Sequence, residues 1–516
     1  MSEAAARETA GQAEPEAARD GQSGGGRGRR LAVMVVSNFV DGDSRVQKTA
    51  RSVAEAGWDV VLLGRARGTA REEYTIGDAR VIRIPLRMTA QTYRKDNPPR
   101  GVAGRLGYRS GEQARMRVDA RRALRADLEV ERRLVAMGDD DLPARLRLTG
   151  LTAADRARGY WIEARRRLYE RAAAKAKQPG NRTRVAIGVG RDGGAWLTQP
   201  QLVDFDTAFA PVIAELKPDL VHAHDFDTIG LVARAGLKLR AAGHPVKIVY
   251  DAHEYIAGWE RPGDPAFRPA MSAQERKYIK LADGVITVSE AIADLLAGDH
   301  GLTTRPTVVC NAPTVAEMAA GGDEVPNVRE AAGLGPDVPL MVYAGITAPE
   351  RSLETAVAAL PDLPGVHLAA VTARNPYVDA LEKQARALGV ADRLHILPYV
   401  KPHQVVAHLA AGSVGIVTSL HSPNYELSLP SKYYEYLNAR LPLVVSDLRT
   451  VGAFTREQGI GEVFPAGDTD AFAAAVRTVL ADRDKYAKPY EGDLLARNTW
   501  EAQVPELLGL YERLVG

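Results

Sequence analysis

Residues 429–437 read Leu-Pro-Ser-Lys-Tyr-Tyr-Glu-Tyr-Leu, and the apolar run Leu441–Val445 follows them closely. Pro430 and Ser431 are residues typical of a helix start. The stretch therefore predicts a helix that begins there and ends near Asn438. The apolar run predicts a buried strand directly behind that helix. A helix that leads into a buried strand is a unit of α/β folds.

Two faces of this predicted helix carry different chemistry. Lys432 and Glu435 are three residues apart and share one face. Tyr433, Tyr436 and Leu437 fall on another face, as core anchors would. A lysine beside the free N–H groups of a helix N-terminus suits a phosphate, and a carboxylate one turn deeper can accept hydrogen bonds from a ribose diol. Two interpretations stay open here: a nucleotide diphosphate site, and a surface helix with an ordinary Lys/Glu pair.

The composition of the 516-residue chain is that of a soluble globular protein, with 45% hydrophobic and 26% charged residues. No apolar run approaches the roughly 18 residues of a membrane-spanning helix. The first thirty residues hold no apolar segment, so they predict a disordered tail instead of a signal peptide. The single cysteine, Cys310, excludes an internal disulfide framework and fits a reducing compartment. We therefore expect a cytoplasmic protein.

Apolar runs of strand length alternate with helical patterns in two parts of the chain, on either side of an Ala-, Gly- and Pro-rich stretch at 312–337. Strands this apolar are typical of parallel sheets that are buried on both faces. The predicted fold class is therefore α/β, with two Rossmann-like domains. Ligands of such sheets bind beyond the carboxyl ends of the strands, so the loops that follow strands carry the candidate site.

A basic segment interrupts the first alternating set. Residues 87–184 hold 25 Lys and Arg against 12 Asp and Glu, a balance of +13 that leaves −11 for the rest of the chain. Helical patterns at 111–137 and 153–177 predict a helical insertion. It has three interpretations: a surface for anionic lipid, a contact with a partner or a second copy, and a solvated hairpin with a charged face. It has no aromatic-interleaved platform, so nucleic acid is not expected.

The loop after the first predicted strand contains Asn38, Asp41 and Arg45. Asp41 and Arg45 either position a polar ligand, or they belong to a capped helix with a local ion pair. No Gly-x-Gly-x-x-Gly fingerprint is present there, so a dinucleotide is not expected.

Histidines follow two later strands, in His222-Ala-His224 and in Asp-Ala-His253-Glu254. His222 and His224 have strand spacing, and no compact helical His pair is present, so no metal site is predicted. His253 lies just past a strand, where it either reaches a sugar or its leaving group or is held by backbone carbonyls.

In the second set, Gly345 follows a strand and allows close backbone approach, and Arg351 is expected to begin a helix. Arginine suits a diphosphate because its fork is planar and always charged. Arg351 and Lys432 come from different loops of one sheet edge, so we expect them to converge on one pyrophosphate.

These stretches together resemble the retaining glycosyltransferases of GT-B architecture, in the family-four group that is also called group one. The resemblance covers about residues 31–87 and 200–516. Six matching stretches occur in the family's order, at 44–57, 249–254, 282–289, 311–313, 343–351 and 429–436.

The resemblance implies two Rossmann-like domains that face a central cleft, with the sugar nucleotide on the second domain and the acceptor facing the first. The implied division is a tail at 1–30, a first domain at 31–315 with the helical basic insertion at about 88–195, a linker at 316–337, a second domain at 338–495, and a helix at 496–516 that crosses back to the first domain.

The resemblance also implies the site. The expected catalytic residues are His253, Arg351 and Lys432; the expected donor-binding residues are Gly345, Arg351, Ser431, Lys432 and Glu435; and the expected acceptor or cleft residues are Asn38, Asp41, Arg45 and Glu254. The diphosphate would lie on Arg351 and Lys432, the ribose on Glu435, and the donor sugar near His253. A nucleoside diphosphate sugar would be the substrate, and neither a metal ion nor a cofactor is expected. The expected partners are a glycan or lipid-linked acceptor and an anionic membrane surface at the insertion.

Three positions depart from the family pattern. Many members carry Glu-x7-Glu, but Leu427 stands at the first position and Glu426 is one residue out of register. Ser352 and Arg440 stand where glycine is usual. Two rival functions remain: a sugar-nucleotide epimerase of the same architecture and a non-catalytic sugar-nucleotide-binding partner.

Overall fold

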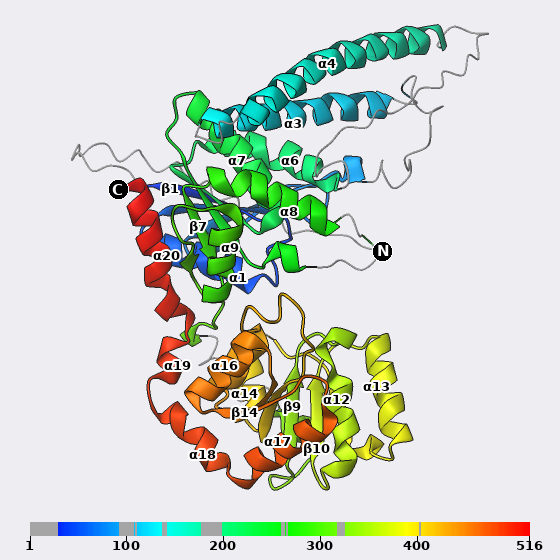
Figure 1. Cartoon of the computed structure of the whole chain (residues 1–516), viewed down its shortest axis with the longest axis vertical. Helices are drawn as coiled ribbons and strands as arrows, with labels where there is room; N and C mark the ends of the chain where they lie inside the picture. Colours follow the sequence, from blue (N-terminus) through cyan, green and yellow to red (C-terminus); the bar gives the residue numbers. More distant parts are fainter. Residues whose placement is uncertain are drawn as a thin grey trace, which may run out of the picture.

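The computed structural model describes residues 29–91, 108, 111–136, 142–176, 199–259, 264, 267–316, 326–401 and 404–516. Most of the expected tail, and part of the expected insertion and linker, therefore lie outside the described residues. Figure 1 shows two sheet-containing halves, with helix α20 (Trp500–Val515) running from the second half along the side of the first. The strands form one eight-stranded and one six-stranded sheet.

The first sheet has the strand order β3-β4-β2-β1-β5-β6-β7-β8, and every pairing is parallel except β3 with β4. The antiparallel edge strand β3 was not predicted, because its polar sequence lacks the apolar run of the buried strands. The strands are β1 (Leu31–Val35), β2 (Asp59–Arg65), β3 (Glu72–Ile76), β4 (Ala79–Ile84), β5 (Leu220–His224), β6 (Lys247–Ala252), β7 (Gly284–Thr287) and β8 (Thr307–Val308).

Helices cover both faces of this sheet. Alternate residues of β1 enter opposite cores: Val33 and Val35 pack with helices α6, α7 and α8, whereas Ala32 and Met34 pack with α1 and α20. This double burial explains the continuous apolar strands. The helices are α1 (Ser44–Glu55), α6 (Gln201–Leu216), α7 (Phe226–Ala241), α8 (Phe267–Tyr278) and α9 (Glu290–His300).

The basic insertion contains a hairpin of two long helices, α3 (Gly111–Ala136) and α4 (Leu142–Ala176), and α4 lies on the outer side (Figure 1). The second helix begins 11 residues before its predicted start at 153, because Pro143 is compatible with the first turn of a helix. Asp127 of α3 lies 3.5 Å from Arg234 and 3.7 Å from Lys277, so ion pairs with α7 and α8 anchor the hairpin.

The second sheet is wholly parallel, in the order β11-β10-β9-β12-β13-β14. Its strands are β9 (Leu340–Ala344), β10 (His367–Val371), β11 (Leu394–Leu397), β12 (Val414–Val417), β13 (Leu443–Ser446) and β14 (Gly461–Phe464). Its helices are α11 (Val328–Ala331), α12 (Leu353–Ala359), α13 (Pro376–Ala387), α14 (Val405–Leu409), α15 (Ser431–Asn438), α16 (Arg449–Gln458), α17 (Thr469–Ala481), α18 (Arg483–Ala487) and α19 (Leu494–Arg497). The predicted α/β class with two Rossmann-like layouts is confirmed, and α15 has its predicted bounds.

Helix α20 contacts the first half near both of its ends, helix α1 at its start and strand β5 near its end. Trp500 is buried, and its Nε1 donates to Ser52 Oγ at 2.9 Å. Near the other end, Tyr511 Oη lies 2.7 Å from His222 Nδ1, and its ring packs edge-on against Trp58 at 5.3 Å.

Both positions where glycine is usual adopt left-handed backbone. Ser352 has φ 49° and Arg440 has φ 54°. After α15, Arg440 N donates to Leu437 O and Leu441 N to Tyr436 O, which is the hydrogen-bond pattern of a helix end that favours glycine. A side chain at Arg440 therefore costs backbone strain.

Replacing Arg440 with glycine should stabilise the protein by about 0.5–1 kcal/mol, because the left-handed conformation costs a Cβ-free residue least. The urea unfolding midpoint measures this change. Arg440→Ala is the matched control, since it removes the same charge but keeps Cβ. Equal midpoints for the two variants would show that backbone strain is not the cause.

Candidate functional site

Gly345 and Lys432 lie together at the carboxyl edge of the second sheet. Gly345 follows β9 with φ 118°, and a Cβ built on it would lie 3.7 Å from Lys432 Nζ. Lys432 lies in the first turn of α15, is buried, and has its Nζ 3.6 Å from the ring centroid of Tyr343. Gly345, which has no side chain, therefore lies next to the Lys432 amino group at the N-terminus of α15.

Arg351 enters the same region from the loop after β9. It ends a 3-10 turn, Pro349–Arg351, and α12 begins only at Leu353, so the prediction that Arg351 begins a helix was wrong. Left-handed Ser352 separates the turn from the helix. The guanidinium lies 4.2 Å from the ring centroid of Tyr425, a cation–π contact that holds it in place.

The charges at this edge favour an anion. Burial lowers the pKa of Lys432 well below its usual range, the positive charge of Arg351 lowers it further, and Glu435 raises it. Two cations close enough to perturb each other gain stability when a negative group lies between them. The structure therefore brings Gly345, Arg351 and Lys432 together as predicted, with half-buried Glu435 on the same helix and exposed Ser431 at its start.

Loops of the first sheet meet this edge. Glu254 follows β6, and burial raises the pKa of its carboxyl, while His253 and Arg351 lower it. Arg351 belongs to the second half, so Glu254 faces it from the first. Ser289 Oγ donates to Leu427 O at 2.5 Å, a direct hydrogen bond between the halves.

The loop at 420–430 explains the missing Glu-x7-Glu carboxylate. Leu427 is buried in the apolar core of the first half. The Glu426 carboxylate binds His421 and accepts a hydrogen bond from Arg449 N at 2.6 Å. Leu427 therefore packs in the protein core, and the Glu426 carboxylate is already bound by other groups of the protein.

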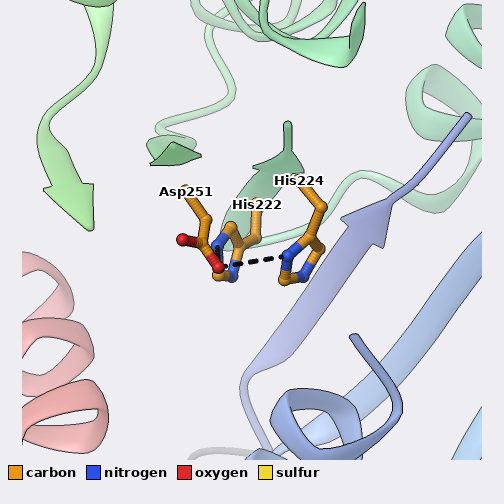
Figure 2. A group of neighbouring side chains, drawn as sticks. All are labelled: His222, His224 and Asp251. Carbon is orange, nitrogen blue, oxygen red and sulfur yellow. Dashed lines mark ion pairs between the residues drawn. The ribbon is translucent and has the colours of Figure 1, made fainter. Parts of the chain in front are cut away.

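Figure 2 shows His222 and His224 of β5 beside Asp251 of β6. One ring nitrogen of each histidine and one carboxylate oxygen of Asp251 lie within 4.8 Å of one another. The same carboxylate accepts two hydrogen bonds from Arg45, at 2.8 and 2.9 Å. Tyr511 Oη lies 2.7 Å from His222 Nδ1. Since a guanidinium already engages both carboxylate oxygens, these side chains form a hydrogen-bonded network, in which a cation would lie close to the positive charge of Arg45.

The three residues after β1 that were predicted to contact a ligand all interact with other protein side chains. Arg45 is buried and forms an ion pair with Asp251 of β6. Asp41 pairs with Arg83 and Arg67. Asn38 Nδ2 donates to the helix-capping Asp43 at 2.7 Å. The alternative of a capped helix with ion pairs describes this loop, although Arg45 pairs with a distant strand.

A cavity of about 340 Å³, which the sequence analysis missed, lies at the carboxyl ends of β10 and β11. It adjoins the β9 loop, because Thr347 Oγ1 lies 3.4 Å from Thr372 Oγ1 and accepts a hydrogen bond from Asn375 at 3.0 Å. The strand-end rule could have located it, but its residues carry no distinctive chemistry. The lining residues are Thr372, Ala373, Arg374, Ile396, Leu397, Pro398 and Tyr399.

Two protein-family models match this chain. The model described as Glycosyltransferase Family 4 matches residues 153–313, and the model described as Glycosyl transferases group 1 matches residues 325–492. The chain belongs to the family 4, group 1 glycosyltransferases. The group 1 match contains the whole edge formed by Gly345, Arg351 and Lys432.

Individual relatives of this glycosyltransferase are distant. It is 27% identical over 316 residues to the GDP-mannose-dependent alpha-(1-6)-phosphatidylinositol monomannoside mannosyltransferase of Mycolicibacterium smegmatis, covering 58% of this chain and 80% of the relative. It is 25% identical over 360 residues to the 2-deoxystreptamine N-acetyl-D-glucosaminyltransferase of Streptomyces fradiae, covering 65% and 79%.

A solved structure confirms the GT-B architecture. The sucrose-phosphate synthase from Thermosynechococcus elongatus superposes with a TM-score of 0.60 at 16% identity, covering 94% of this chain and 99% of that one. Within the described ranges, no helix has the length and apolar character needed to cross a membrane.

Proposed function

We propose that this glycosyltransferase moves a hexosyl group from a nucleoside diphosphate sugar to an acceptor hydroxyl, with retention at the anomeric carbon and without a metal ion. The convergence of Arg351 and Lys432 beside Gly345 carries the proposal. These groups supply the positive charge that a divalent cation would otherwise supply.

The bond between the anomeric carbon and the diphosphate oxygen breaks in this reaction, and its electron pair leaves with the diphosphate. Arg351, Lys432 and the N-terminus of α15 are positioned to stabilise the charge that develops there. The departing phosphate oxygen takes the proton of the acceptor hydroxyl, which attacks from the same face. No nucleophilic carboxylate is therefore needed.

The rest of the donor is assigned to neighbouring groups. We place the ribose on Glu435 and the base in the cavity between Thr372 and Tyr399, since both adjoin the proposed diphosphate site. His253 and Glu254 face the same region from the first half and are assigned to the donor sugar and the acceptor side. The name of the M. smegmatis relative makes GDP-mannose the first donor to test.

Turnover tests the proposal directly. The purified protein is incubated with GDP-mannose, UDP-glucose, UDP-galactose and UDP-N-acetylglucosamine, each with and without EDTA, and release of nucleoside diphosphate is followed. We expect release with at least one donor, unaffected by EDTA, and a product whose anomeric configuration by NMR equals that of the donor. Inversion, EDTA sensitivity or epimerisation of the intact donor would each contradict part of the proposal.

The outer face of α4 favours a lipid-linked acceptor among the glycan, lipid-linked and small-molecule classes. Tyr160 and Trp161 are 81% and 51% exposed, and Leu142 and Leu146 are 70% and 64% exposed. Where the structure describes side chains of α4, four arginines are exposed: Arg145, Arg147, Arg156 and Arg167. The carboxylate of Glu163, whose side chain is 42% exposed, pairs with Arg166 and Arg167. Exposed apolar and aromatic side chains among arginines suit an anionic bilayer surface. We therefore propose a peripheral protein of the cytoplasmic membrane face.

Flotation with vesicles tests this surface. The wild type should float with vesicles containing anionic lipid and not with zwitterionic ones, and the double variant Tyr160→Ala/Trp161→Ala should bind several-fold less because it loses interfacial aromatic area. Leu388→Ala, which removes an exposed apolar residue of the second half, is the control. Absence of flotation would refute membrane docking, and equal flotation on both vesicle types would refute the dependence on anionic lipid. Concentration-dependent dimerisation lost in the double variant would indicate a second copy instead.

A further inference from the structure

We propose that Arg45 and Asp251 are positioning residues that fix the imidazole of His253 at the edge of the cleft, leaving its Nδ1 for the substrate. The inference rests on the proposed transferase function, in which His253 contacts the donor sugar. It gives a role to a buried ion pair that the mechanism above does not use.

Asp251 is held rigidly. Its side chain is 2% exposed, and Arg45 donates to both carboxylate oxygens, from Nε at 2.9 Å and from Nη2 at 2.8 Å. Arg45 Nη1 also donates to Val309 O at 2.7 Å, so the guanidinium bridges β6 and the chain after β8. A bidentate pair of this kind has one geometry and does not rotate freely.

The carboxylate in turn holds His253. Asp251 Oδ2 lies 3.4 Å from His253 Nε2 and 3.4 Å from His224 Nδ1, and the two ring nitrogens lie 3.3 Å apart. His253 is 16% exposed, whereas the other two side chains are almost completely buried. The contact with Asp251 therefore fixes the ring of His253, the most exposed of these three side chains. With Nε2 facing Asp251, Nδ1 is the remaining ring nitrogen.

The surrounding charges agree with this geometry. Burial lowers the pKa of His253, but the charges of Asp251 and Asp225 and the hydrogen bond to Asp251 raise it, so the pKa is raised overall. Burial lowers the pKa of His222 and of His224, so the pKa of His253 is shifted in the opposite direction from those of its two neighbours. The charged and titratable groups around His253 are Asp251 on β6, His222 and His224 on β5, Asp225 after β5, Arg45 on α1 and the adjacent Glu254.

Stability alone is a weak explanation for such a buried ion pair. A buried arginine–carboxylate pair is often no more stable than apolar residues of similar size, because both charges must leave water. Here Arg45 lies at the start of α1, and Asp251 lies near the end of β6, two residues before His253. The pair therefore fixes the position of the His253 loop relative to the first sheet.

A double-mutant cycle distinguishes positioning from general stability. With the preferred donor, Asp251→Asn should lower kcat about 100-fold, as a misplaced group does, with little change in the KM of the donor. In a His253→Ala background the same substitution should have almost no further effect on kcat, because Asp251 acts through His253. Arg45→Lys keeps the charge but loses the planar guanidinium, and it should give an intermediate kcat at a temperature where circular dichroism shows the variant to be folded.

Asp283→Asn is the matched control, since Asp283 also pairs with an arginine, Arg240, beside the same sheet. Additive effects of Asp251→Asn and His253→Ala, or wild-type kcat in folded Asp251→Asn, would overturn the inference. If Asp251→Asn does not fold, the cycle is made with Arg45→Lys. Absence of turnover by the wild type with every donor would contradict the proposed function instead.

Discussion

Replacing Lys432 with methionine should lower kcat/KM for the donor by a factor of about 10³ while leaving the fold intact. The loss has this size because one preorganised donor at a developing negative charge contributes roughly 10²–10³ in rate. Methionine fills the space next to the Tyr343 ring without creating a large cavity. Initial rates of nucleoside diphosphate release, with circular dichroism as the check on folding, measure the effect. Arg351→Ala should give a loss of similar size.

Lys485→Met is the matched control for this substitution. Lys485 also belongs to the second half, and its Nζ lies 4.6 Å from the ring centroid of Tyr486, but it is exposed and lies outside the proposed site. Its turnover should equal that of the wild type. Near-normal turnover in folded Lys432→Met would remove Lys432 from the mechanism.

Replacing Trp500 with alanine should lower the free energy of unfolding by about 3–5 kcal/mol, the usual cost of removing a buried aromatic side chain. Trp500 is buried where α20 meets α1, its Nε1 donates to Ser52, and Lys48 Nζ lies 5.0 Å from its ring centroid. All three contacts disappear together in the variant. Urea unfolding measures the change.

Trp161→Ala on the outer face of α4 is the control for Trp500→Ala, because it removes the same side chain from an exposed position. Its free energy of unfolding should change by no more than about 0.5 kcal/mol. Similar values for the two variants would mean that docking of α20 does not stabilise the first half.

Local sequence signals predicted the strands of the second sheet and the helix α15 at its carboxyl edge. Pro430 and Ser431 mark the start of α15, and the apolar spacing of Tyr433, Tyr436 and Leu437 correctly predicted that all three are buried. The convergence of Arg351 and Lys432 followed from a topological rule, since carboxyl ends of neighbouring parallel strands share one edge. These features depend on residues that are close in sequence or on the fold class alone.

Ion pairs between residues that are far apart in the sequence could not be predicted from these local signals. Arg45 pairs with Asp251, which lies 206 residues away, and nothing near Arg45 in the sequence indicates that partner. Asp41 pairs with Arg83 of a strand whose antiparallel neighbour, β3, carries a polar pattern. The turn that ends at Arg351 depends on a non-glycine residue with positive φ, which sequence patterns assign to glycine.

The structure explains why Leu427 stands at the first position of the Glu-x7-Glu pattern. Leu427 belongs to the second half of the chain but is buried in the core of the first, and its carbonyl accepts a hydrogen bond from Ser289. A glutamate there would place a charge in an apolar core, at considerable cost. The position therefore serves contact between the halves, and donor selectivity must come from other residues.

Calorimetric binding of nucleotides tests most directly whether the edge formed by Gly345, Arg351 and Lys432 is a diphosphate site. GDP, UDP and ADP are each compared with the corresponding monophosphate, in the wild type and in Lys432→Met. We predict that at least one diphosphate binds about 10–100-fold more tightly than its monophosphate, as charge-assisted hydrogen bonds to the second phosphate require, and that Lys432→Met loses this margin. Equal affinity for mono- and diphosphates in the wild type would contradict the assignment of this edge as a diphosphate site. An unchanged ratio of the two affinities in Lys432→Met would contradict it as well.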